Sequence, residues 1–145
     1  MLVLQQRHIA SFYLFNMAQM SFEKPDLARI LKEKPTLTAQ LNGELGDTPN
    51  VYFYGNVVSW PLIGSQKANP ALKKDSTLGI IQPGQYALLT SYKEIVTVLN
   101  GTLKAVVGEG ELKEYAPLEQ VVAEAQTNLH IQVDSEPVQY LCEYH

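Results

Sequence analysis

The segment from Glu94 to Val107 constrains the fold of this chain more than any other. It contains two apolar runs rich in β-branched residues, and Asn100-Gly101 joins them. Asn-Gly is typical of a two-residue type I′ turn, because both residues tolerate a positive φ there. The segment therefore predicts a β-hairpin with Glu94 at its start.

Alternation of apolar and polar residues continues along the chain from Val51 onward. The runs are short and separated by Pro, Gly, Asp and Ser, as in β-strands joined by turns. No run of helical length alternates with them, so the pattern favours an all-β jelly roll over a parallel α/β fold. Besides the hairpin, the expected strands are Val51–Ser59, Thr77–Ile81, Gln85–Ser91, Glu119–Ala123, Leu129–Val133 and Val138–Tyr144. We expect the long loop Gly64–Asp75 to lie near a pocket at the barrel mouth.

The N-terminal third differs from the rest, and we divide the chain into an appendage, 1–49, and a barrel, 50–145. Residues 25–34 begin with Pro-Asp, carry apolar residues on one face and lysines near the end, and are followed by Pro35. This pattern predicts a short amphipathic helix. The helix either covers the barrel or acts as an arm that docks a partner or braces a dimer.

Composition narrows the class of protein. The chain has 145 residues with 46% hydrophobic content, which suits a single core. A net charge of −4 argues against binding to a nucleic-acid backbone. The single cysteine, Cys142, is expected to be a buried, reduced thiol of a cytoplasmic protein. No apolar run approaches the roughly 20 residues that a membrane helix needs, and the stretch from Ile9 to Phe15 is short for a signal peptide.

Four segments of the barrel half form a characteristic set. They are Tyr52-Phe53-x-Gly55-x-Val57-x-Ser59, Ser76-Thr77-Leu78-Gly79, Glu94 through Gly101, and the ending Tyr140-Leu141-Cys142-Glu143-Tyr144. Together they resemble the pyrimidine/purine nucleoside phosphorylase family of small single-domain cupins. The resemblance implies a cupin-type double-stranded β-helix that acts as a homodimer. It also implies phosphorolysis of purine and pyrimidine nucleosides, with neither metal nor cofactor, to free base and pentose 1-phosphate.

That reaction passes through a transition state with positive charge on the ribose, which favours a nearby carboxylate. Glu94 is our candidate catalytic residue, to bind ribose hydroxyls or to stabilise that charge; the alternative is a solvated residue before a strand. The candidate substrate-binding residues are Thr77, Tyr86, Thr90, Tyr140 and Tyr144. Their hydroxyls or rings suit a nucleoside, although each type is also an ordinary strand or core residue.

The chain departs from other cupins in its metal and anion ligands. Metal-binding cupins carry a His-x-His motif a few residues before the glutamate, but the residues just before Glu94 include no histidine. His130 is expected to face outward. We therefore expect no metal site. Residues 50–145 contain no arginine. We therefore expect Lys73 and Lys74 to bind phosphate, with backbone N–H groups or an arginine from the appendage, Arg7 or Arg29, as alternatives.

Two other functions remain open on the sequence. The missing arginine suits a non-catalytic cupin that binds a small metabolite. The appendage suits an interaction protein. Glu143 should point away from Cys142 on the last strand, into a dimer interface.

Overall fold

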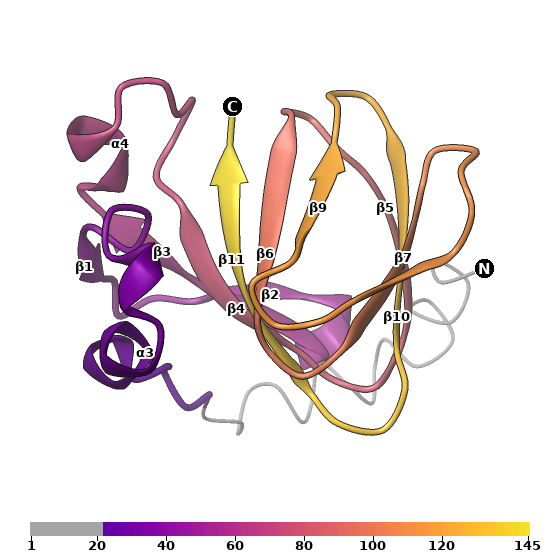
Figure 1. The fold of residues 1–145 in the computed structure, drawn as a ribbon, viewed down its shortest axis with the longest axis horizontal. Coiled ribbons are helices and arrows are strands. Elements are labelled where there is room, and N and C mark those ends of the chain that lie inside the picture. The colour runs from indigo at the N-terminus through magenta and orange to yellow at the C-terminus, as the bar shows by residue number, and fades with distance from the viewer. Residues whose placement is uncertain (1–21) are drawn as a thin grey trace.

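The structure, a computed structural model, describes residues 22–145. It confirms an all-β jelly roll in which two antiparallel sheets face each other (Figure 1). The larger sheet has seven strands in the order β1-β3-β4-β11-β6-β9, with β2 paired to β3, and the smaller has four in the order β5-β10-β7-β8. The strands are β1 Glu44–Leu45, β2 Asn50–Tyr52, β3 Val57–Ile63, β4 Thr77–Ile81, β5 Gly84–Leu89, β6 Glu94–Asn100, β7 Leu103–Val107, β8 Lys113–Tyr115, β9 Gln120–Ala123, β10 Asn128–Val133 and β11 Val138–Tyr144.

The two faces of the larger sheet bury different apolar sets, because side chains alternate along each strand. The inner face packs against the smaller sheet in a cluster that includes Val96, Val98 and Tyr140. The outer face carries Leu62, Leu78, Leu99 and Leu141, which are all fully buried. The larger sheet therefore needs a second cover on its outer face.

The N-terminal segment supplies that cover. Helix α3, Leu27–Glu33, begins at Asp26, whose side chain accepts a hydrogen bond from Arg29 N at 3.1 Å. Ile30 and, beyond the short helix η1 (Pro35–Leu37), Leu41 join the outer cluster. Of the two interpretations of this helix, the structure shows the one in which it packs on the barrel, and β1 even adds to the sheet by pairing with β3.

The predicted Asn-Gly hairpin is wrong. Strands β6 and β7 belong to different sheets, so the turn between them is a corner of the barrel. Of Asn100 and Gly101, only Gly101 has a positive φ, 85°, so the turn is not type I′. Asn100 instead donates from its side chain to Gln139 Oε1 at 2.8 Å.

The expected strand Val51–Ser59 is also interrupted. It forms β2 and β3, which pair with each other around the short helix η2, Phe53–Gly55. Phe53, Tyr54 and Gly55 have φ values of 50°, 55° and 93°, a left-handed run that reverses the chain. Two bulky residues in this region are strained, and such strain is concentrated at functional sites.

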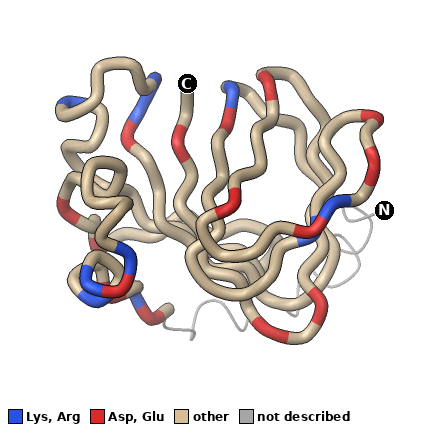
Figure 2. The backbone as a smooth tube through the Cα atoms, in the orientation of Figure 1, with Lys and Arg blue, Asp and Glu red and all other residues tan. Residues whose placement is uncertain are grey.

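Charged residues are spread over the loops, α3 and several strands (Figure 2). Along the described backbone, Lys and Arg do not gather into a stripe. None of the helices within residues 22–145 is long and apolar enough to cross a membrane.

Candidate active site

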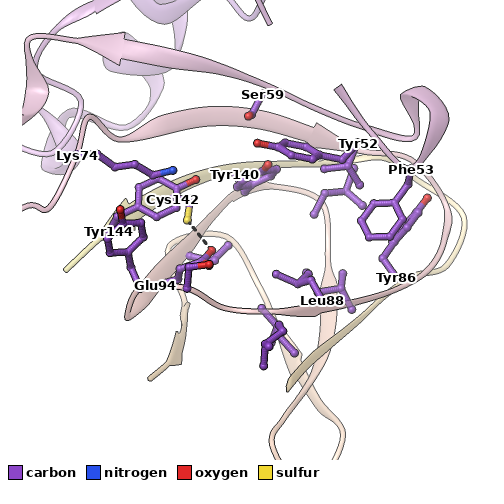
Figure 3. Close-up of a pocket in the computed structure, with 18 residues that line it drawn as sticks. Tyr52, Phe53, Ser59, Lys74, Tyr86, Leu88, Glu94, Tyr140, Cys142 and Tyr144 are labelled. Atoms are coloured by element: carbon purple, nitrogen blue, oxygen red, sulfur yellow. Dashed lines mark hydrogen bonds between the residues drawn. The ribbon is translucent and has the colours of Figure 1, made fainter. Parts of the chain in front are cut away.

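A cavity of about 600 Å³ lies inside the barrel, between the two sheets. Its volume is within the usual range for a site that encloses a small molecule. Strands β3, β6 and β11 of the larger sheet and β5 and β10 of the smaller sheet supply most of its lining. Figure 3 shows that the side chains at its two ends differ in chemistry.

One end is charged and holds Lys74, Glu94, Cys142 and Tyr144 (Figure 3). The thiol of Cys142 donates to Glu94 Oε1 at 3.3 Å. The ammonium of Lys74 lies 4.2 Å from the ring centroid of Tyr144 and 5.5 Å from that of Tyr92. Both contacts are cation–π interactions. Lys74 comes from the loop Gly64–Asp75, which therefore lies at the pocket as expected.

Burial controls the protonation of this end. Partial burial of Glu94 raises the pKa of its carboxyl group, while the Cys142 hydrogen bond and the charge of Lys74 oppose the rise. Burial, followed by the neighbouring Glu94, raises the pKa of the Cys142 thiol well above its usual value. Cys142 is thus a hydrogen-bond donor to Glu94, and it is the buried free cysteine that the sequence predicts.

The opposite end is aromatic and apolar. Phe53 and Tyr86 pack with ring centroids 5.1 Å apart at an angle of 55°, and Leu88 and Ile131 continue this surface. The hydroxyl of Tyr86 donates to the carbonyl of Gln82 at 2.7 Å, which leaves the ring itself as the part that faces the cavity. The strained turn at Phe53 places its ring in this wall.

Tyr140 lies between the two ends (Figure 3). Burial, with added effects of Cys142 and Tyr52, raises the pKa of its phenol, and hydrogen bonding with Ser59 opposes the rise. The phenol is therefore a neutral hydrogen-bond donor at any physiological pH. Burial raises the pKa of Tyr144 in the same way.

The structure brings together five of the residues that the sequence singled out: Glu94, Lys74, Tyr86, Tyr140 and Tyr144. It does not place Thr77, Thr90 or Lys73 in the cavity lining. The Thr77 hydroxyl supports the site from behind by sharing a hydrogen bond of 3.1 Å with the Tyr144 hydroxyl.

Thr90 has a structural role instead. Its hydroxyl donates to the carbonyl of Glu124 at 2.6 Å and accepts from Thr127 N at 3.0 Å, so it holds the turn after β9. Lys73 donates its backbone N–H to the carbonyl of Tyr144 at 2.7 Å, and its side chain is exposed. These contacts leave Thr90 and Lys73 outside the site.

Two alternatives for anion binding are also resolved in part. Helix α3 lies against the outer face of the larger sheet, and Arg29 is on the exposed side of this helix, where it pairs with Glu33 at 2.9 Å. Arg29 therefore does not reach the cavity of its own chain. Arg7 lies outside the described residues. Glu143 is buried on the side of β11 opposite Cys142, as alternation predicts, and its burial raises the pKa of its carboxyl group.

Sequence reasoning missed Phe53 and Ser59 as lining residues and Cys142 as the partner of Glu94. Both Phe53 and Ser59 lie in the first segment of the family resemblance, Tyr52 through Ser59, which we interpreted as one plain strand. The register Cys142↔Val96 and Tyr144↔Glu94 between β11 and β6 brings the thiol beside the carboxylate. That register is set by the whole sheet and has no local signal.

The barrel half of the chain matches a known protein family. The family model described as pyrimidine/purine nucleoside phosphorylase matches residues 47–144. A pyrimidine/purine nucleoside phosphorylase of Cronobacter sakazakii is 31% identical over 96 residues, which cover 66% of this chain and 95% of the relative.

Solved structures show the same architecture. A protein of unknown function from Vibrio parahaemolyticus is 28% identical with a TM-score of 0.59, covering 71% of this chain and 100% of that one. A cupin domain of an XRE-family transcriptional regulator from Enterobacter cloacae is 22% identical with a TM-score of 0.51, covering 62% of this chain and 96% of that domain. The barrel thus has a cupin-type fold, and the chain belongs to the pyrimidine/purine nucleoside phosphorylase family.

Proposed function

We propose that this protein cleaves the N-glycosidic bond of purine and pyrimidine nucleosides with inorganic phosphate, releasing free base and pentose 1-phosphate, without a metal ion or cofactor. The observation that carries the proposal is a single cavity with a charged end, Lys74 and Glu94, and an aromatic end, Phe53 and Tyr86. A nucleoside with phosphate at its C1′ has the same polarity.

The proposed orientation follows from charge. Phosphate lies at Lys74, whose ammonium is the cation of the described cavity lining. The ribose lies over Glu94, where the carboxylate binds hydroxyl groups in the ground state and stabilises positive charge at C1′ in the transition state. Lys74 faces both Glu94 and the phosphate, which limits the repulsion between the two anions.

The base then occupies the aromatic end. Stacking on Phe53 and Tyr86 tolerates any base, since every base presents a π-face. This suits a site that accepts both purines and pyrimidines. The proposal also includes the homodimer and the cytoplasmic location expected from the sequence; the edge strand β9, with its exposed Val122, offers backbone groups for pairing between copies.

The experiment is to incubate the protein with uridine or adenosine in phosphate-free buffer and then with added phosphate, and to measure free base and ribose 1-phosphate. We expect both products in equal amounts and only with phosphate, unchanged after treatment with EDTA. Base release without phosphate would indicate a hydrolase. Binding of nucleosides with no product would favour the other candidate, a non-catalytic cupin, which the absence of arginine from residues 50–145 suits.

A further inference from the structure

Ser59, Gly79 and Tyr140 lie in one row across three neighbouring strands. Gly79 on β4 is the register partner of both Ser59 on β3 and Tyr140 on β11. A Cβ atom on Gly79 would lie 2.4 Å from both Cζ and Oη of Tyr140. The phenol therefore lies directly over the Gly79 backbone and points towards Ser59, an arrangement that only a glycine permits.

A second feature acts on the same side chain. Between β11 and β6, Gln139 pairs with Asn100 but Tyr140 pairs with Val98, so the register shifts immediately before Tyr140. A β-bulge redirects the side chain beside it, and bulges are frequent next to active sites. The register shift and Gly79 thus both act on the direction of the Tyr140 phenol.

Hydrogen-bond direction shows where the phenol proton is available. The side-chain N–H of Asn50 can only donate, and it donates to Ser59 Oγ at 3.4 Å. The Ser59 proton is then free to donate to the Tyr140 oxygen, in line with the lowering effect of Ser59 on the pKa of Tyr140. With its oxygen stabilised by Ser59, Tyr140 keeps its own proton for an acceptor in the cavity.

We infer, on the basis of the proposed function, that the Tyr140 hydroxyl donates a hydrogen bond to the departing nucleobase. Tyr140 lies between Glu94, where the ribose is placed, and Phe53, where the base is placed (Figure 3). Negative charge on a departing base is shared with the O2 atom of a pyrimidine or a ring nitrogen of a purine, and both accept hydrogen bonds. One neutral donor therefore serves both classes of base.

The step balances without ionising the tyrosine. An oxygen of hydrogenphosphate bonds to C1′, the C1′–N bond breaks, and its electron pair goes to the base. The base then takes the proton that the hydrogenphosphate carried, which gives a neutral base and the pentose 1-phosphate dianion. Tyr140 only donates a hydrogen bond, and its raised pKa favours donation over loss of the proton.

Leaving-group dependence tests this role. The rates of phosphorolysis of uridine and 5-fluorouridine are measured for the wild-type protein and for Tyr140→Phe. We expect kcat for uridine to fall on the order of 10²-fold, the usual effect of removing one such donor. The loss for 5-fluorouridine should be distinctly smaller, because its base is less basic and needs the donor less. Tyr115→Phe, half-buried on β8 and outside the cavity lining, is the matched control and should leave both rates unchanged.

A second variant acts on the same hydroxyl without changing the ring. Ser59→Ala should lower the uridine rate less than Tyr140→Phe does, again with a smaller loss for 5-fluorouridine. Equal losses for the two nucleosides, or no loss in Tyr140→Phe, would overturn the donor role while leaving the phosphorylase standing. A wild-type protein that releases no base from either nucleoside in the presence of phosphate would instead remove the proposed function itself.

Discussion

At the residue scale, the position of Lys74 determines how an anion is held. Its ammonium is supported by the faces of Tyr144 and Tyr92, and no carboxylate of residues 22–145 forms a salt bridge with it. A cation held in this way keeps its N–H donors for a ligand. This arrangement supports the proposed phosphate site even though residues 50–145 contain no arginine.

Lys74→Ala should raise KM for phosphate by about 10- to 100-fold, the usual effect of losing a charged hydrogen bond. KM for the nucleoside should change much less, because the base and ribose contacts remain. Steady-state kinetics with phosphate varied at saturating uridine measures this. Lys67→Ala, on the exposed helix α4 (Ser65–Ala68), is the control, and an equal effect of the two substitutions would contradict the phosphate assignment.

Glu94 links the site to stability. Burial raises its pKa in the folded protein above the unfolded value, so ionisation of this carboxyl group destabilises the fold. The stabilising contribution is fully present below the unfolded pKa and is lost as pH rises through the raised folded pKa.

Replacing Glu94 by Gln removes that loss. The free energy of unfolding of Glu94→Gln, relative to wild type, should therefore be larger at pH 7 than at pH 4. Urea denaturation at both pH values measures the difference. Glu109→Gln, at an exposed turn, controls for the loss of one carboxyl group. If the stability difference between Glu94→Gln and wild type is the same at both pH values, ionisation of the buried Glu94 does not destabilise the fold.

At the element scale, the corner between β6 and β7 depends on Gly101. Its φ is 85°, and an added Cβ would lie 2.7 Å from the carbonyl oxygen of Pro137. Gly64, with a φ of 94°, has nothing within 4 Å of the corresponding position. Substitutions at the two glycines can therefore distinguish the cost of backbone strain from the cost of a steric clash.

Gly64→Ala should lower the free energy of unfolding by about 1–2 kcal/mol, the cost of a left-handed backbone for alanine. Gly101→Ala carries the same strain together with the clash and should cost more, about 2–4 kcal/mol. Chemical denaturation compares both with the wild type. Equal losses would mean that the corner has room to relax.

The sequence predicted those elements whose pattern is complete within the element. Strands β4 and β11 have the predicted bounds, because turn residues mark where each apolar run begins. The Asn100-Gly101 turn was misassigned, since its residues suit a hairpin and a barrel corner equally; long-range pairing decides between them. The left-handed turn at Phe53 was missed because aromatic residues rarely adopt that backbone.

The residues of the candidate site were likewise predictable only where the local sequence carries the information. The family resemblance selected Glu94, and residue type with strand parity selected Tyr140. None of these shows whether a hydroxyl is already engaged, as that of Thr90 is with Glu124. The row of Ser59, Gly79 and Tyr140 joins strands far apart in sequence. Such a row follows from sheet order, which no local pattern encodes.

At the scale of the whole molecule, the larger sheet packs against other elements on both of its faces. Its inner face lines the cavity, and its outer face is closed by α3 and the residues that follow. The described residues from α3 to Leu41 therefore share a hydrophobic core with the sheet that carries Glu94 and Tyr140.

Leu41→Ala tests this unity. Leu41 is 2% exposed against the outer face, so its truncation should lower the free energy of unfolding by about 2–5 kcal/mol. Leu112→Ala, with 51% exposure, should change it by about 0.5 kcal/mol or less. Similar small effects from both would mean that the segment packs only loosely on the barrel.

The cavity as a whole acts as one site only if the carboxylate at its charged end works on the nucleoside. The direct measurement is the rate of ribose 1-phosphate formation from uridine and phosphate, by wild type and by Glu94→Gln, with nucleoside binding measured in parallel. We predict a fall in kcat on the order of 10²-fold or more at nearly unchanged affinity, because charge and not shape is removed. A rate within about twofold of the wild type would contradict the account, since Glu94 would then take no part in the transition state.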